Sequence, residues 1–158
     1  MDTRKYLYSL LVLSVLIQVT ATKYFACFPD LIIAAVVFTG IFYGLGRGFE
    51  LGLAAGILRG IFSAETISVD VLILPAVGMI SALLARMVYR HNPFVQMVIT
   101  FVAVFMTVLF HTVYLNLIYG NDLNYLSVFA KSWRPIAATV FFSPFLFAFL
   151  KRSLKVES

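Results

Sequence analysis

The sequence predicts an all-α integral membrane protein with about six transmembrane helices in a single domain, residues 1–158. Of its 158 residues, 62% are hydrophobic and only 12% are charged, whereas soluble domains carry about 25% charged residues. The mean hydropathy is +0.99. At about 20 residues for each span, this length allows five or six helices and no separate soluble domain. The net charge of +5 is therefore attributed to orientation in the lipid bilayer and not to nucleic-acid binding.

Apolar runs separated by polar, proline and glycine residues place the six helices. The expected spans are residues 6–25, 30–45, 48–63, 70–90, 93–119 and 134–150. The first run is interpreted as a span rather than a cleaved signal peptide, because the rest of the chain continues as membrane sequence. The second and third spans are short, so they either cross a thinned bilayer or form a partly re-entrant pair.

Boundary signals justify the second and third spans. Pro29 and Asp30 open the second span, since proline suits the first helical position and an acid complements the helix dipole. The segment Gly44–Gly48 predicts a tight glycine-rich turn, after which the third span runs to Ser63.

The last three spans have similar signals. Asp70 falls in the first turn of the fourth helix, where an acid is favourable. Asn92 and Pro93 start the fifth helix as cap and first-turn proline. Pro135 is expected to begin the sixth helix, after a loop from Asn124 to Trp133.

The distribution of basic residues predicts that both termini lie on the cytoplasmic side. Inside segments would then hold eight of the 12 Lys and Arg residues and outside segments the other four, as the positive-inside rule requires. The inside set is Arg4, Lys5, Arg47, Arg86, Arg90, Lys151, Arg152 and Lys155. The outside set is Lys23, Arg59, Lys131 and Arg134.

Glycine occurs at every fourth position from Gly40 to Gly60, in otherwise apolar sequence. Such spacing lets two helix backbones approach closely within a membrane. A four-residue step exceeds one turn by about 40°, so only three or four of these glycines share a face. The predicted packing face is Gly48, Gly52, Gly56 and Gly60, with a second stripe of Gly78, Ala82 and Ala85 as its mate. A face that contacts a partner or ligand is the alternative for this stripe.

Several charges lie near the ends of the third span. Arg59 is one turn from the outer end, where a charge costs less than the roughly 3 kcal/mol expected at mid-membrane. It is expected to pair with Glu65 or Asp70, or to form with them a site that contacts a partner. Glu50 and Arg47 are three residues apart and are expected to form a solvated local pair.

His111 and Asn116 form a candidate intramembrane polar site in the fifth span. An ionisable residue within a membrane is a functional candidate, and a neutral histidine bonded to a neighbouring helix is the alternative. No second His or acid lies three or four residues away, so no metal site is predicted. The sequence has no G-x-S-x-G, H-E-x-x-H or P-loop motif, and its one cysteine matches no ligand spacing. We therefore expect no catalytic residue, no cofactor and no enzymatic activity.

From Pro29 to His111, the order of features resembles the rod shape-determining MreD family. The segment Gly48–Ser63 contains G-x-x-x-G-x-x-x-G leading into a sequence similar to the family's L-[RL]-D-[LI]-[FI]-S signature. An apolar helix with Val77-Gly78-Met79 follows, and then the basic turn Val88–Asn92. The family usually has an aspartate where Gly60 stands, so the role of that acid is open unless Glu65 or Asp70 replaces it.

The resemblance implies a non-enzymatic scaffold in the bacterial inner (cytoplasmic) membrane. Such a scaffold binds MreC and works with RodA, a class B penicillin-binding protein and MreB in cell elongation, cell shape and peptidoglycan synthesis. The fold of the family is also similar to that of the substrate-binding subunits of energy-coupling-factor vitamin transporters, which is the alternative function. Those subunits commonly have an A-x-x-x-A face on the first helix, and the segment Leu10–Leu16 lacks it.

Overall fold

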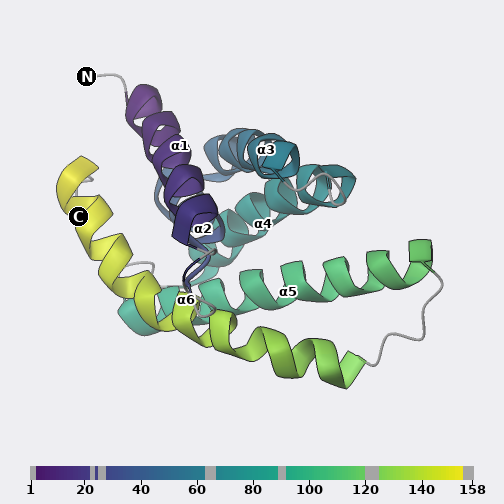
Figure 1. Ribbon diagram of the computed structural model, residues 1–158. Coiled ribbons are helices and arrows are strands. Elements are labelled where there is room, and N and C mark those ends of the chain that lie inside the picture. The colour runs from purple at the N-terminus through teal and green to yellow at the C-terminus, as the bar shows by residue number, and fades with distance from the viewer. Residues whose placement is uncertain are drawn as a thin grey trace.

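The computed structural model consists of six α-helices and describes residues 3–21, 24, 28–62, 67–88, 92–119 and 125–154 (Figure 1). The helices are α1 (Thr3–Ala21), α2 (Leu31–Tyr43), α3 (Leu45–Phe62), α4 (Ile67–Met87), α5 (Pro93–Tyr119) and α6 (Tyr125–Leu154). The predicted all-α class and the number of helices are therefore confirmed for these residues.

Helix α2 lies at the centre of the molecule. It contacts each of the other five helices, and all its residues from Ile32 to Ile41 are buried. A helix that is apolar on every side is buried either in a protein core or in a membrane, and here the other helices cover it. Phe38 on α2 packs against Phe147 on α6, with ring centroids 5.5 Å apart. The hydrophobic core is therefore organised around this short helix.

Helices α3 and α4 form a closely packed antiparallel pair (Figure 1). A Cβ atom built on Gly52 would lie 2.5 Å from the carbonyl oxygen of Leu74, and one on Gly56 would lie 2.5 Å from that of Asp70. These distances are too short for any side chain. The glycines therefore set how closely α3 approaches α4, as small residues do between membrane helices.

The register of this pair differs from the expected mate on α4. Gly48 lies against Gly78, so the α4 side of the contact consists of Asp70, Leu74 and Gly78. Ala82 and its neighbour Ser81 instead lie against Gly40 of α2. The pairs Gly48/Gly78, Gly52/Leu74 and Gly56/Asp70 define this register. Gly60 is also buried on α3.

The break between α2 and α3 is a single residue. Gly44 has a φ of 87°, which favours glycine, and its N–H bonds to the carbonyl of Gly40 at 3.2 Å. Helix α3 starts at once, since the N–H of Gly48 already bonds to the carbonyl of Gly44 at 2.9 Å. The prediction of a turn over Gly44–Gly48 is therefore correct only for Gly44, because α3 already begins at Leu45.

Helix α6 begins earlier than the proline signal indicated. It starts at Tyr125, so Pro135 and Pro144 both lie inside it, and the expected loop up to Trp133 is helical. Proline is tolerated inside membrane helices because neighbouring groups satisfy the backbone that it disrupts. One turn after Pro135, the hydroxyl of Thr139 donates to the Pro135 carbonyl at 2.7 Å, a bond to the carbonyl one turn earlier that threonine commonly makes within helices.

Other boundaries differ by a few residues. Helix α4 covers Ile67–Met87 where residues 70–90 were expected, and α1 ends at Ala21. Arg90 and His91, at the expected basic turn, lie outside the described residues.

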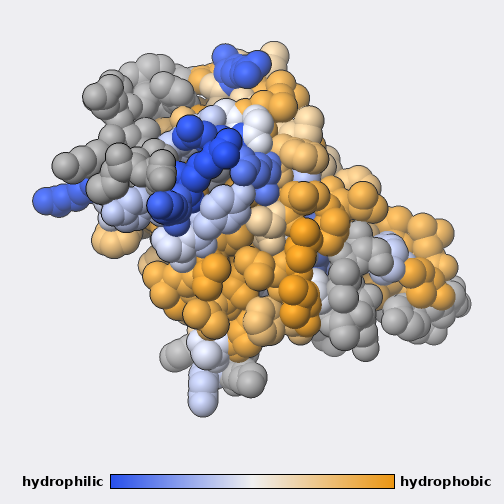
Figure 2. Space-filling model, turned by 90° about the horizontal axis from the view of Figure 1, so that it is seen from above, coloured by the Kyte–Doolittle hydropathy of each residue, from blue (hydrophilic) through white to orange (hydrophobic). Residues whose placement is uncertain are grey.

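Among the described residues, three helical segments are long and apolar enough to cross a membrane: Val69–Met87, Pro93–Ile118 and Ser132–Ser153. Helix α2 is apolar but has only 13 residues, roughly 20 Å at 1.5 Å per residue. Helix α3 carries three charged residues within its 18 positions. Figure 2 shows a broad hydrophobic surface beside a group of hydrophilic residues. These features support a multi-pass membrane protein with three candidate spans, and the crossing of all six helices stays a prediction.

Candidate functional site

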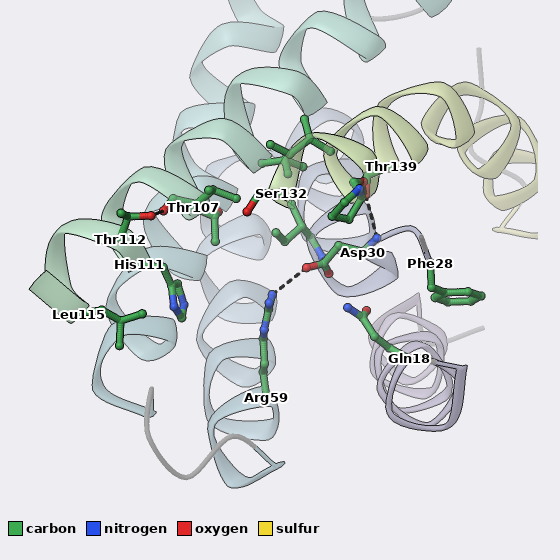
Figure 3. Close-up of a pocket in the computed structure, with 15 residues that line it drawn as sticks. Gln18, Phe28, Asp30, Arg59, Thr107, His111, Thr112, Leu115, Ser132 and Thr139 are labelled. Atoms are coloured by element: carbon green, nitrogen blue, oxygen red, sulfur yellow. Dashed lines mark hydrogen bonds and ion pairs between the residues drawn. The ribbon is translucent and has the colours of Figure 1, made fainter. Parts of the chain in front are cut away.

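Four ionisable side chains from four helices meet in a charged cluster, which we define as Asp30, Arg59, Asp70 and His111. One guanidinium nitrogen of Arg59 lies 2.9 Å from a carboxylate oxygen of Asp30, and its Nε lies 3.7 Å from Asp70. The other carboxylate oxygen of Asp70 lies 2.9 Å from Nε2 of His111. Figure 3 shows Arg59 directed toward Asp30, with His111 on a different helix. The cluster thus links α2, α3, α4 and α5.

Helix ends place the charges of the cluster. Asp30 is the N-cap of α2, and its carboxylate accepts the N–H of Ile33 at 3.1 Å. Asp70 is in the first turn of α4, and Arg59 is in the last turn of α3. Acids near N-termini and cations near C-termini are favoured by the helix dipoles. Gly56, less than one turn before Arg59, lets α3 approach the backbone of Asp70, so the glycine stripe brings the two charges together.

The cluster is largely removed from solvent. The Asp70 side chain has no exposed surface, and those of Arg59 and His111 are 24% and 22% exposed. A buried carboxylate is tolerated only when partners replace its water, and each oxygen of Asp70 has at least one such partner. Removing one member of a buried pair costs about 3–5 kcal/mol. The cluster therefore ties four helices together.

A cavity of about 420 Å³ adjoins the cluster. Asp30, Arg59 and His111 line it, together with polar residues from α1, α5 and α6 and an apolar wall. The polar lining consists of Gln18, Thr107, Thr112, Ser132 and Thr139, and the apolar lining includes Phe28, Ile33, Val104, Val108, Leu115 and Ile136. Figure 3 shows these side chains converging from several helices. The cavity therefore combines charged, hydroxyl and apolar groups in one site.

The structure brings together only some of the residues that the sequence singled out. Arg59 pairs with Asp70, one of the two acids considered for it, and Glu65 lies outside the described residues. Asp70 is fully buried, and the partner contact expected around Arg59, Glu65 and Asp70 stays a prediction. His111 is bonded to a neighbouring helix and also lines the cavity, whereas Asn116 does not line it.

The expected local pair between Arg47 and Glu50 is not formed. Glu50 instead accepts a hydrogen bond from the hydroxyl of Tyr8 at 2.8 Å and lies 4.0 Å from Arg4. Arg47 lies over the ring of Tyr43, 5.4 Å from its centroid. Partners on α1 and within α2 are nearer than the residue three positions away, because α1 packs beside α3 at this end.

Sequence reasoning missed Asp30 as the main partner of Arg59. The residues are 29 positions apart, and the capping role of Asp30 was sufficient to account for it. The expected topology could have indicated this pair. It placed the start of the second span, with Asp30, and the end of the third span, with Arg59, on the same side of the membrane. The threonines of the cavity gave no comparable signal, because single hydroxyls are common in membrane helices.

The arrangement can hold helices together and can bind a polar or charged ligand in the cavity. Within the described part of the chain, no group of three or more His, Cys, Asp and Glu side chains could hold a metal ion. No model of a protein family matches the chain, and no curated protein or solved structure matches it either.

Proposed function

We propose that the protein is a non-enzymatic scaffold of the bacterial cell-elongation machinery, in the inner membrane with both termini in the cytoplasm. In this proposal it binds an MreC-like protein and acts, through it, with RodA, a class B penicillin-binding protein and MreB. The proposal rests on the resemblance to the MreD family. The segment that carries the resemblance, Gly48–Ser63, lies almost entirely on α3.

The observation that supports a scaffold best is the two-sided character of α3. One face carries the glycines against α4, and a second face, about 100° round the helix, leaves apolar side chains uncovered. The uncovered side chains are Phe49, Leu53, Ile57 and Ile61, each four residues from the next, together with Phe62. Residues four apart lie on one side of a helix. The glycine face packs α3 into the helix bundle, and the uncovered apolar stripe stays available to bind a membrane-anchored partner.

Affinity purification of the tagged protein in mild detergent, from its own host, tests this proposal. We expect an MreC-like protein to co-purify with the wild-type chain. Replacing Ile57 and Ile61 by alanine should reduce its recovery, because both side chains lie on the uncovered stripe of α3. The matched control replaces two exposed residues of α6, Phe145 and Phe149, and should leave recovery unchanged. Recovery that never includes an MreC-like protein would contradict the scaffold.

The alternative is a substrate-binding subunit of an energy-coupling-factor vitamin transporter, and the cavity favours it. A volume of about 420 Å³ falls within the range of roughly 300–1,000 Å³ for small-molecule pockets. The same purification separates the two functions. Recovery of an ATPase pair with a coupling membrane subunit would support the transporter function.

A further inference from the structure

We propose that one end of the helix bundle binds the phosphate headgroups of anionic phospholipids. We call it the basic end and define it by its exposed or half-buried cations, Arg4, Lys5, Arg47, Arg86, Lys151 and Arg152. The proposal goes beyond the scaffold function and does not depend on it. Three features support it: an excess of cations, their contacts with aromatic rings and their position at the ends of candidate membrane spans.

The first helices to meet at the basic end are α1 and α3. The hydroxyl of Tyr8 donates to the carboxylate of Glu50 at 2.8 Å, so both helices begin at this end. Arg4 and Arg47 line the same small pocket between them. Two cations that are far apart in the sequence therefore lie close together.

Helices α4 and α6 end where α1 and α3 begin. The ammonium group of Lys151 lies 4.5 Å from the ring centroid of Phe42, so the end of α6 lies beside the end of α2. Gly78 of α4 lies against Gly48 near the start of α3. Arg86 is about two turns beyond Gly78 on α4 and belongs to the same end.

The charges at the basic end do not balance. Of the described acids, Asp30 and Asp70 belong to the charged cluster at the other end of α3, and Glu50 lies here. Glu50 accepts the Tyr8 hydroxyl and lies 4.0 Å from Arg4, whose side chain is still 70% exposed. Six cations thus accompany one acid among the described residues. Each Lys or Arg near a membrane surface strengthens the binding of anionic lipid about fivefold.

Two of the cations lie over aromatic rings at the end of α2. The guanidinium of Arg47 lies 5.4 Å from the ring centroid of Tyr43, and Lys151 lies over Phe42, the preceding residue. A ring attracts a cation without cancelling its charge. The two contacts therefore position cations from α3 and α6 around the end of α2 and leave their charges to attract an anion.

The start of α3 adds to the attraction for an anion near Arg47. The first N–H groups of a helix have no partner within the helix, and the helix dipole favours negative charge there. Helix α3 has no acid in its first turn and carries Arg47 there instead. Gly46 beside it is exposed, and a Cβ on it would meet nothing within 4 Å. A phosphate at this position is attracted by the guanidinium and by the backbone together.

The position of the cations favours a lipid over a soluble anion. Lys151 and Arg152 lie at the end of the candidate span Ser132–Ser153, and Arg86 lies at the end of the candidate span Val69–Met87. The ends of a span lie at the level of the headgroups. Exposed apolar side chains follow within two turns of these or other cations, namely Phe49, Phe145 and Phe149. A phospholipid can contact the cations with its phosphate and the apolar side chains with its acyl chains.

Native mass spectrometry of the full chain, released from a nonionic detergent, tests the proposal. The protein is mixed with equal amounts of phosphatidylglycerol and phosphatidylcholine that have the same acyl chains, and the retained lipid is identified. We expect about tenfold more phosphatidylglycerol at about 50 mM salt and less than about threefold more at about 500 mM, where charges are screened. Equal retention of the two lipids at low salt, or a preference that does not change with salt, would overturn the proposal.

Two arginines in matched settings locate the site. Arg47 and Arg134 are both exposed, and Arg134 lies 5.8 Å from the ring centroid of Trp133 as Arg47 lies over Tyr43. Arg47→Gln should reduce the preference for phosphatidylglycerol about fivefold. Arg134→Gln, outside the basic end, should keep it within about twofold. Equal loss in both variants would overturn the proposal. Should Arg47→Gln not fold, Arg152→Gln removes a charge from the same end.

A competitor without acyl chains separates a lipid from a soluble anion. Glycerol phosphate carries the phosphate group alone, so we expect it to leave the retained phosphatidylglycerol unchanged when the two are present at equal concentration. Displacement under that condition would assign the basic end to a soluble phosphate and overturn the lipid proposal. None of these measurements depends on recovery of an MreC-like protein, so failure of the scaffold function and failure of lipid binding are distinguishable.

Discussion

Arg59 is a largely buried cation held by two acids. Its guanidinium lies between two acids from different helices, one of which has no exposed surface. Burying such groups is favourable only while all of them are paired. The charge of Arg59 thus stabilises the fold first, whatever else the residue contacts.

Arg59→Ala should lower the free energy of unfolding by about 3–5 kcal/mol, since Asp70 would stay buried with its guanidinium partner gone. Unfolding of the purified protein in detergent by added denaturant measures this. The matched control is Arg152→Ala, because Arg152 is exposed near the end of α6. It should change stability by no more than about 0.5 kcal/mol. Equal effects of the two variants would mean that the buried pair does not stabilise the protein.

The stability that the hydrogen bond of His111 contributes can be measured separately from that of its side-chain volume. His111→Phe keeps a ring but leaves one oxygen of Asp70 without its donor, and should cost about 1–3 kcal/mol of stability. His111→Gln retains a donor and should cost clearly less. Thermal unfolding of both variants in detergent gives the comparison. If His111→Gln were the less stable variant, the bond to Asp70 would not be what holds α5 at the cluster.

At the scale of elements, the α3–α4 pair shows which features of helix packing a glycine spacing pattern can predict. Glycines four residues apart were enough to predict a packing face, and Gly48, Gly52 and Gly56 lie at the α3–α4 contact. The pattern did not give the register, because Gly78, Ala82 and Ala85 are all small residues. In the structure only glycine fits opposite Gly48, because a Cβ on Gly78 would overlap the carbonyl oxygen of Gly48.

The glycine contact is testable within one helix. Gly52→Ala places a Cβ 2.5 Å from the backbone oxygen of Leu74, so α3 must move outward at a cost of about 1–3 kcal/mol. Gly46→Ala is the control, because a Cβ there meets nothing within 4 Å. It should stabilise the helix by up to about 1 kcal/mol. If both substitutions changed the free energy of unfolding in the same direction, the role of Gly52 would not be close packing against α4.

For the whole molecule, the open question in its topology is how many helices cross the membrane. If all six cross, the link between α2 and α3 and the link between α5 and α6 lie on opposite sides. If only α4, α5 and α6 cross, both links lie on the same side, because α1 to α3 all precede the first crossing. Helix α2 is compatible with either arrangement, since other helices surround it.

Cysteine labelling distinguishes the two topologies. In a Cys27→Ser background, we expect Asn121→Cys to react with a membrane-impermeant thiol reagent added to intact spheroplasts. Gly46→Cys should react only after the membrane is opened, because six crossings place it in the cytoplasm. Gly46 is exposed and has room for a side chain, so access is not limiting. The same labelling behaviour of Gly46→Cys and Asn121→Cys in intact spheroplasts would contradict six crossings.

The sequence by itself determined the membrane class, the six helices and the glycine face, because hydropathy and small-residue spacing are local properties of the chain. It also placed Arg59, Asp70 and His111 among the candidates. Only the tertiary structure decided that Asp30 joins them and that a cavity lined by hydroxyl groups opens beside them. Those features depend on the relative positions of side chains from five or more helices, and no local pattern in the sequence specifies how such distant segments pack.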